Sequence, residues 1–305
     1  MDIRVKTVVS GVLFLLGSKE IFAAESGKSS YPPGGSMYFI GEYPPVPGNY
    51  LQSLTYYGTA NRVNDHKGNK TENLNFDLSV VSESLRFVTA WDSHLLKADA
   101  VASELILTYA SVRNSLDMPN GRMTSTADGL GDIVIAPLAF QWNLGEKKNW
   151  QTAATIYYVI PSNSYSKQKA LNISNNHYSI QPTFGVKYRS ESGFSAGISP
   201  RVSLNWKNED TKYKNGTEFF ADYMFSYKVG NWEPGIVGYY STQFENDEMD
   251  GVKIKNSKTE GFSIGPAIYY NHANKVFISG SFQKDLMAKN KSQNNSLFLS
   301  VAFPY

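Results

Sequence analysis

Apolar and polar residues alternate one by one along most of the chain after residue 50. From Phe194 to Lys207, apolar residues occupy the even positions and polar residues or glycine the odd ones. Successive side chains of a β-strand point to opposite faces, so this period predicts strands with one apolar and one polar face. Twelve strands are predicted, over residues 50–62, 73–91, 98–113, 132–144, 150–160, 177–190, 194–207, 216–229, 232–245, 258–271, 275–286 and 295–304.

The connections between these strands alternate in length. Long polar connections cover residues 63–72, 114–131, 161–176, 208–215, 246–257 and 287–294, and short ones cover 92–97, 145–149, 191–193, 230–231 and 272–274. Long loops on one side and tight turns on the other are typical of a bacterial outer-membrane barrel. A soluble β-sandwich would contain similar strands, but it explains neither this asymmetry nor an apolar face on every strand. The pattern therefore predicts an all-β transmembrane antiparallel barrel in the outer membrane, in contact with its lipid.

Two kinds of irregularity are predicted within the strands. The second strand changes phase between Ser82 and Ser84, and a β-bulge there would restore the facing of its side chains. Pro137, Pro182 and Pro200 lie in mid-strand in the lipid-facing phase, although proline cannot donate to a ladder. Two interpretations stay open: bulges that only shape the barrel, or a break in the wall that lets apolar solutes pass sideways into the membrane.

The strand ends and the carboxyl terminus carry aromatic side chains. Rings near strand ends match the interfacial girdles of such barrels; they are Trp142, Trp150, Tyr188, Trp206, Trp232, Phe244 and Tyr270. Phe303 and Tyr305 end a run that is apolar at every second position. This ending is similar to the signal by which outer-membrane proteins engage the barrel insertion machinery, which we therefore expect as a partner.

The first 49 residues do not follow the alternation. Arg4 and Lys6 precede an apolar stretch from Thr7 to Leu16, and Ala23 offers a cleavage point, so residues 1–23 are predicted to be a signal peptide. Residues 24–49 are too rich in Pro and Gly to form a ladder strand. This segment is predicted either to lie in the periplasm or to fold into the lumen as a plug, and residues 50–305 form the barrel.

Composition excludes several other classes. The 305 residues include 20 Tyr, 17 Phe and 5 Trp, yet no apolar run after the N-terminus approaches the ~18 residues of a spanning helix. The net charge of +2 gives no reason to expect nucleic acid as a partner. The absence of cysteine excludes disulfides, thiolate metal sites and cysteine nucleophiles.

Catalytic and metal chemistry find little support in the sequence. His177 and Ser179 share one face of a strand and suggest the pair of an outer-membrane phospholipase, but both fall in the polar phase rather than facing lipid. The acidic run over 245–250 lacks the regular spacing of cation ligands. We therefore expect no catalytic site, no metal and no cofactor.

Charged residues also occur in the polar phase, which faces the lumen of a barrel. They are predicted to line the lumen, and they are Asp77, Glu83, Arg86, Glu104, Lys187, Arg201, Glu218, Asp222, Lys228 and Asp285. Two compatible interpretations stay open: a network of ion pairs that fills a narrow lumen, or a channel lining that selects solutes by charge.

Short motifs along the chain resemble a known family. In order they are Pro44-Pro45-Val46-Pro47-Gly48, Asn61-Arg62-Val63-Asn64-Asp65, Gly129-Leu130-Gly131-Asp132, Trp142-Asn143-Leu144-Gly145, Gly230-Asn231-Trp232, Gly265-Pro266 and Ala302-Phe303-Pro304-Tyr305. From Gly34 to Tyr305 the chain resembles the meta-pathway phenol degradation family of twelve-stranded outer-membrane channels. One departure is Lys289 to Asn294, where such proteins often have a turn containing Arg-Pro.

The resemblance implies a passive channel for small, often hydrophobic or aromatic molecules, with no enzymatic activity. Two other classes stay open on the same barrel: an enzyme that acts on lipid, and a surface adhesin or receptor. An adhesin should have long apolar or aromatic-tipped outer loops, whereas these loops are rich in Asn, Lys, Ser and Asp.

Overall fold

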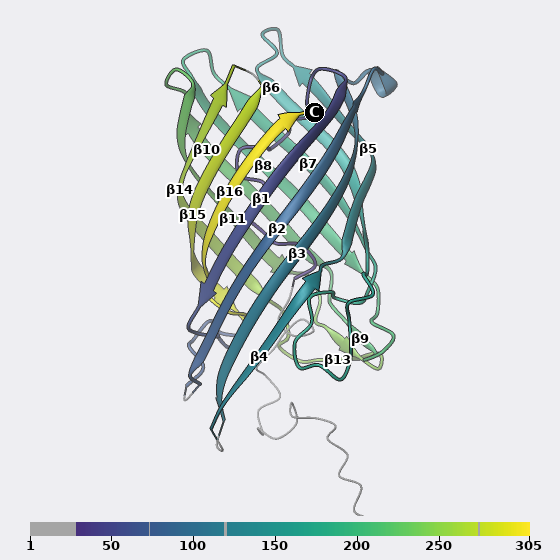
Figure 1. Ribbon diagram of the computed structural model, residues 1–305, viewed down its shortest axis with the longest axis vertical. Coiled ribbons are helices and arrows are strands. Elements are labelled where there is room, and N and C mark those ends of the chain that lie inside the picture. Colours follow the sequence, from purple (N-terminus) through teal and green to yellow (C-terminus); the bar gives the residue numbers. More distant parts are fainter. Residues whose placement is uncertain (1–28, 73, 119–120, 274) are drawn as a thin grey trace, which may run out of the picture.

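Twelve strands among the described residues close into an antiparallel barrel (Figure 1). The computed structural model describes residues 29–72, 74–118, 121–273 and 275–305. β1 (Gly48–Ala60) pairs with β2 (Phe76–Trp91) on one side and with β16 (Asn295–Pro304) on the other, and β2 pairs with β3 (Ala100–Met118), which closes the ring. The other barrel strands are β5 (Ile133–Leu144), β6 (Trp150–Ile160), β7 (Ser179–Arg189), β8 (Phe194–Asn205), β10 (Glu218–Tyr227), β11 (Trp232–Gln243), β14 (Glu260–His272) and β15 (Val276–Lys289).

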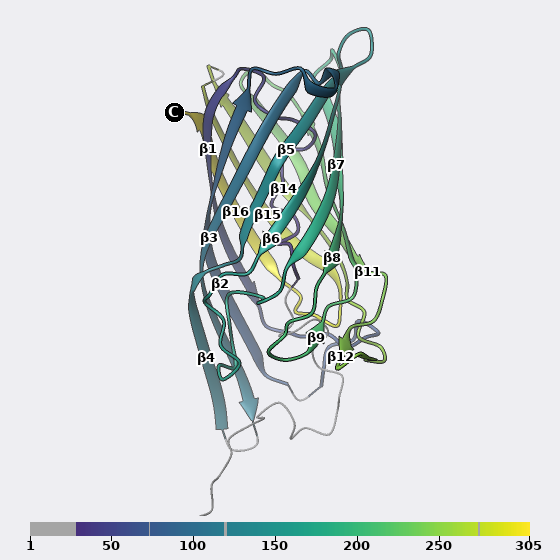
Figure 2. The same ribbon diagram turned by 90° about the vertical axis from the view of Figure 1, so that its right-hand side faces the viewer.

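The outer half of β3 continues beyond the barrel in a hairpin. β4 (Gly121–Leu130) pairs with Tyr109 to Met118 of β3, and the hairpin projects past the wall in Figure 2. The prediction of a loop over residues 114–131 is therefore wrong. This stretch has polar residues on both faces because it extends past the apolar band, while its backbone groups still pair across the hairpin.

The two ends of the barrel differ as the loop lengths predicted. The five tight turns and the carboxyl terminus lie at one end, here called the short-turn end, where Leu95–Lys97 forms a 3-10 helix. The opposite, long-loop end carries the small strands β9 (Tyr213–Lys214), β12 (Glu248–Met249) and β13 (Val252–Lys253), which form a separate three-stranded sheet. No helix within the described residues is long and apolar enough to span a membrane.

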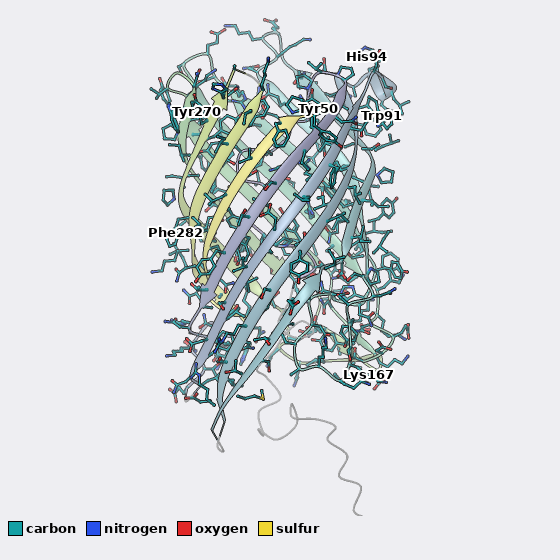
Figure 3. The ribbon with its side chains drawn as sticks, in the orientation of Figure 1. Tyr50, Trp91, His94, Lys167, Tyr270 and Phe282 are labelled. Atoms are coloured by element: carbon teal, nitrogen blue, oxygen red, sulfur yellow. The ribbon has the colours of Figure 1, made fainter. Side chains whose placement is uncertain are left out.

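The outer wall of the barrel is apolar. Phe225 and Ile236 face each other across β10 and β11 and remain 50% and 47% exposed, which suits contact with lipid. Trp91 and Tyr270 lie near the short-turn end in Figure 3, and Phe282 projects from the wall. Burial of apolar side chains in a water-excluded core is thus not what holds this wall together; its closed ladder satisfies the backbone groups that lipid cannot.

The register of β2 is continuous on both sides. Its pairs with β1 run without a shift from Gly48–Ala90 to Ala60–Leu78, so the predicted bulge at Ser82–Ser84 is wrong. The hydroxyl groups of two β1 residues, Ser53 and Thr55, donate hydrogen bonds to the Glu83 carboxylate. These hydrogen bonds give the Glu83 carboxylate partners on the outer face of the barrel. The strand therefore needs no bulge to bring this side chain to the lumen.

Residues 29–47, here called the lumenal segment, lie inside the barrel and run along its length (Figures 1 and 2). At one end Ser30 Oγ donates to Glu218 at the start of β10, 2.6 Å away, and at the other end β1 begins at Gly48. Met37 and Ile40 are almost fully buried. They pack against side chains from four strands, Met224, Val237, Ala267 and Phe298. The sequence left two locations open for residues 24–49; for the described part, residues 29–47, the structure has the lumen.

Candidate functional site

Asp222 on β10 holds the first turn of the lumenal segment. Its carboxylate accepts hydrogen bonds from the backbone N–H of Gly34 at 2.9 Å, the N–H of Ser36 at 3.1 Å and the hydroxyl of Tyr31 at 2.7 Å. Three donors from one short stretch satisfy most of the accepting capacity of a buried carboxylate. Asp222 therefore acts as an anchor for the segment rather than as a free charge in the lumen.

A second anchor lies toward the short-turn end. Lys187 Nζ, whose side chain is only 1% exposed, donates to Tyr38 O at 2.7 Å and to Glu42 Oε2 at 2.8 Å. Arg189 Nε and Nη2 donate to the two oxygens of Glu42, both at 3.0 Å. Glu233 approaches Arg189 from β11 at 3.5 Å. Bidentate pairing of this kind is among the strongest side-chain interactions, and it fixes the direction of the segment.

Glu104 on β3 is the centre of a third cluster. Its carboxylate, with a side chain 0% exposed, pairs with Arg86 Nε at 2.6 Å. The hydroxyl groups of Tyr43 and Tyr157 also donate to it, the second at 3.1 Å. Gln141 accepts from the backbone N–H of Tyr43. A charge removed from water needs such a full set of partners, and here one of them comes from the lumenal segment.

The backbones of the lumenal segment and the wall meet at two glycines. Gly41 has φ +67°, a conformation that favours glycine, and a Cβ added at Gly185 of β7 would lie 2.7 Å from Gly41 N. Backbone atoms are in contact there, so neither side has a flexible group that can move away.

We expect the substitution Gly185→Ala to destabilise the protein by about 1–3 kcal/mol, because the added methyl group would displace the lumenal segment or the strand. The free energy of unfolding in detergent micelles, measured by urea titration, tests this. Gly131→Ala is the matched control, since its Cβ would meet its nearest neighbour at an ordinary 3.5 Å. Equal losses in the two variants would show that the close contact carries no special constraint.

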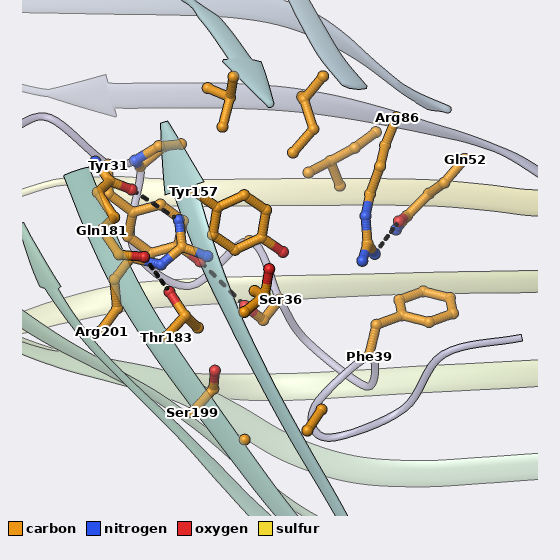
Figure 4. Close-up of a pocket in the computed structure, with 18 of the residues that line it drawn as sticks. Tyr31, Ser36, Phe39, Gln52, Arg86, Tyr157, Gln181, Thr183, Ser199 and Arg201 are labelled. Atoms are coloured by element: carbon orange, nitrogen blue, oxygen red, sulfur yellow. Dashed lines mark hydrogen bonds between the residues drawn. The ribbon is translucent and has the colours of Figure 1, made fainter. Parts of the chain in front are cut away.

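A cavity of about 180 Å³ lies between the lumenal segment and strands β1 to β3 and β5 to β8 (Figure 4). Its aromatic lining consists of Tyr31, Phe39, Tyr43 and Tyr157, and Arg86 and Arg201 are the cations among its lining residues. The Arg201 guanidinium carbon lies 3.9 Å from the centre of the Tyr31 ring and 4.5 Å from that of Tyr157. The cavity is thus aromatic with a cationic side chain, an arrangement that suits binding of a small ring.

Seven of the ten charged residues predicted to face the lumen lie on the inward face of the wall. They are Arg86, Glu104, Lys187, Arg201, Glu218, Asp222 and Asp285. Most are occupied with partners; Asp285, for example, accepts from the hydroxyl of Tyr239 at 2.7 Å. The structure therefore places most of these charges in contacts with the lumenal segment, and it pairs Arg86 with Glu104.

The other three predicted lumen residues do not face the lumen. Glu83 shares its outward face with the exposed Val81 and Leu85. Asp77 lies on β2 opposite Ser115, near the tip of the β3–β4 hairpin, where it pairs with Arg122. Lys228 follows the last residue of β10 and is exposed in a short turn. The three errors have one origin, because the phase of part of a strand was extended to residues where it does not apply. Lys228 lies in a turn, Asp77 lies beside the projecting hairpin, and the strand that contains Glu83 has no bulge to change its phase.

Sequence reasoning missed several functional contacts. Arg189 lies within the predicted strand over 177–190 and shares the phase of Lys187, so the alternation already placed it on the lumen face. Tyr157, which also faces inward, is indistinguishable in the sequence from the wall tyrosines near it. Glu42 and Glu233 gave no signal, since neither lies within a regular alternation.

His177 and Ser179 do not form the hydrogen-bonded pair that the phospholipase alternative requires. His177 Nδ1 lies 3.2 Å from the carbonyl oxygen of Tyr178, and Ser179 Oγ accepts a hydrogen bond from Gln181 at 3.3 Å. No hydrogen bond between His177 and Ser179 occurs in the described part of the chain. Within these same residues, no group of three His, Asp or Glu side chains is arranged to hold a metal ion.

Strand pairing is interrupted beside the three mid-strand prolines, which all face outward. The register of β5 with β6 shifts between Ile135 and Ala139, which places Pro137 in a bulge. Pairs between β7 and β8 run as far as Ile180–Leu204, recur at Thr183–Arg201 and resume at Val186–Ile198, so the ladder is interrupted at Pro182 and Pro200. These irregular stretches border the cavity, whose lining includes Ala154 and Gly185.

Comparison with known families decides the identity. The profile of the family described as "Putative MetA-pathway of phenol degradation" matches residues 60–301. The chain belongs to this family. The match confirms the resemblance seen in the sequence motifs, and a comparison with curated proteins yields no significant match.

Solved structures confirm the fold of this family member. The COG4313 outer membrane channel from Pseudomonas putida F1 superimposes with a TM-score of 0.73 at 17% identity, over 87% of this chain and 97% of that one. The β domain of the Bordetella autotransporter BrkA gives a TM-score of 0.50 at 8% identity, over 85% of this chain and 99% of that one. A closed twelve-stranded barrel with an apolar wall is an outer-membrane architecture, and the predicted fold and location are confirmed.

Proposed function

We propose that this protein is a passive channel through which small hydrophobic or aromatic molecules enter the cell, and that it is not an enzyme. The observation that carries the proposal is the aromatic cavity inside a closed barrel, between the wall and the lumenal segment. Two facts support it: the similar fold of a protein described as an outer membrane channel, and a family description that refers to phenol degradation. The outward prolines supply a further feature that a catalytic barrel does not need.

The test is entry of solute into vesicles whose outer leaflet contains lipopolysaccharide, since that leaflet, unlike phospholipid, is a barrier to apolar molecules. Vesicles with the protein should take up phenol and toluene several-fold faster than vesicles without it. The rate should rise linearly with concentration and need no energy source. Equal rates with and without the protein would refute the channel.

The interrupted wall supports a lateral route from the cavity into the membrane. Around Pro182 and Pro200 the strands β7 and β8 lack cross-strand pairs, and the cavity reaches Gly185 on β7. Apolar molecules that leave the cavity through this stretch would reach the lipid without passing along the part of the lumen that the lumenal segment fills. The route is part of the proposal, and it predicts an effect of closing the wall covalently.

We expect a disulfide between β7 and β8 to slow the uptake of toluene by about tenfold. In the register that the Thr183–Arg201 and Val186–Ile198 pairs share, Phe184 and Pro200 are opposite each other, so cysteines at these positions would tie the two strands together across the interruption. The chain has no cysteine of its own. Toluene uptake by F184C/P200C is therefore compared before and after reduction of the same sample.

The matched control is F225C/I236C, which places a disulfide between β10 and β11, where pairing is regular. Its oxidation should leave uptake unchanged. If oxidation of the β7–β8 pair also leaves uptake unchanged, solute takes an axial path and the lateral route is wrong.

A further inference from the structure

Arg201 is the cation of the cavity that has no carboxylate partner. Arg86 pairs with Glu104. Lys187 and Arg189, which do not line the cavity, pair with Glu42. Arg201 by contrast donates to the neutral Gln181 Oε1 at 3.0 Å, and no carboxylate among the described residues lies within salt-bridge distance of it. A partly enclosed guanidinium without an anion is unusual, because its desolvation is offset only by rings and one amide.

The rings beside Arg201 leave the edge of its guanidinium for a ligand. Figure 4 shows the group between Tyr31 from the lumenal segment and Tyr157 from β6. The guanidinium carbon lies over the Tyr31 ring at 3.9 Å and over the Tyr157 ring at 4.5 Å, and a planar guanidinium carries its N–H donors at its edge. One nitrogen is used by Gln181. The remaining donors form the fork that binds a carboxylate with two parallel hydrogen bonds.

The rest of the cavity suits a single aromatic ring. Leu54, Ile106 and Val134 add aliphatic surface to the tyrosine and phenylalanine rings of the lining. Its volume of about 180 Å³ is of the size that holds one ring, since an apolar cavity of ~150 Å³ in another protein binds benzene.

We propose that the cavity binds an aromatic monocarboxylate of one ring, with its carboxylate on the edge of Arg201 and its ring against the tyrosines. That this molecule is a transported solute rests on the channel function proposed above. Because Tyr31 belongs to the lumenal segment, the ligand contacts the segment and the wall at once. The site thus gives the channel a preference for anionic aromatics over neutral ones of equal size.

The experiment is calorimetric titration of the full chain in nanodiscs with benzoate, benzyl alcohol and benzylammonium, which share a ring and differ in charge. Benzoate should bind about tenfold or more tightly than benzyl alcohol, as expected of a hydrogen bond between two charged groups, and benzylammonium should bind most weakly. This series uses the unaltered protein, so it does not depend on the folding of a variant. Equal affinities for the three ligands would overturn the proposal.

The substitution Arg201→Gln should abolish the preference for benzoate and leave the affinity for benzyl alcohol within about twofold of its starting value. Arg201→Lys should keep part of the preference, because the charge remains but the fork is lost. Arg113→Gln removes the same charge from a residue that does not line the cavity, and it should change nothing. A preference for benzoate that survives in the Arg201→Gln variant would overturn the assignment to this residue.

Uptake of the same ligands separates this proposal from the channel function. If neither benzoate nor benzyl alcohol enters vesicles while benzoate still binds in an Arg201-dependent manner, the channel fails and the anion site stands. If both enter and no ligand is preferred in binding, the channel stands and the anion site is wrong.

Discussion

Deletion of residues 30–43 is expected to raise the ion conductance of the protein by roughly an order of magnitude. The lumenal segment fills the interior with Met37, Tyr38 and Ile40, which are at most 2% exposed. Barrels somewhat larger than eight strands have interiors that side chains alone do not fill, so removal of the segment leaves a water-filled path. Single-channel recording in planar bilayers measures the change.

The barrel itself should survive this deletion, since its ladder closes between β2 and β3 without any pair from the segment. The charges that the segment now covers, such as Asp222 and Lys187, would become hydrated in the open lumen. Circular dichroism should show unchanged strand content.

A deletion of equal length in the β3–β4 hairpin, residues 114–127, is the control. It joins Ser111 and Asp128, which are already paired, through a two-residue turn and leaves the lumen filled. Its conductance should match that of the intact protein. If the deletion of residues 30–43 conducts no better than this control, the segment does not obstruct the lumen.

The substitution Glu104→Ala is expected to destabilise the barrel by about 3–5 kcal/mol, because it leaves Arg86 without its ion-pair partner in the lumen. Arg86 is only 20% exposed, and the hydroxyl groups of Tyr43 and Tyr157 lose their acceptor at the same time. Urea unfolding in phospholipid bilayers, followed by tryptophan fluorescence, gives the free energy of unfolding.

Two further variants serve as comparisons for the loss of stability in Glu104→Ala. Glu104→Gln keeps an acceptor for the tyrosines and should cost less than Glu104→Ala. Asp77→Ala breaks an ion pair whose members, Asp77 and Arg122, are 66% and 42% exposed, and it should cost about 1 kcal/mol or less. A loss at Glu104 no larger than the loss at Asp77 would contradict a structural role for the buried cluster.

The sequence left two interpretations of the lumenal charges open, an ion-pair network that fills the lumen and a lining that selects solutes by charge. Different charged residues fit each of them. Asp222, Lys187, Glu218 and Glu104 all contact the lumenal segment, so they belong to a network that fills the interior. Arg201 faces the cavity and has no anionic partner among the described residues, so it has the property expected of a lining that discriminates by charge. Both interpretations describe part of the same lumen.

The sequence by itself determined the barrel. Each strand must present apolar side chains to lipid and polar ones to the lumen, which produces an alternation with a period of two. This alternation can be recognised without any knowledge of the tertiary structure. It also determined which end carries the long loops and that Pro137, Pro182 and Pro200 face outward. These properties follow from neighbours along the chain.

Only the tertiary structure decided what fills the barrel. Residues 29–47 have no period, and their location depends on partners far away in the chain, such as Asp222 for Gly34 and Lys187 for Tyr38. The same applies to the outward direction of Glu83, which is satisfied by hydroxyls of a neighbouring strand. Hydrogen bonds of polar side chains across a lumen leave no local pattern, because either partner can come from any strand that faces inward.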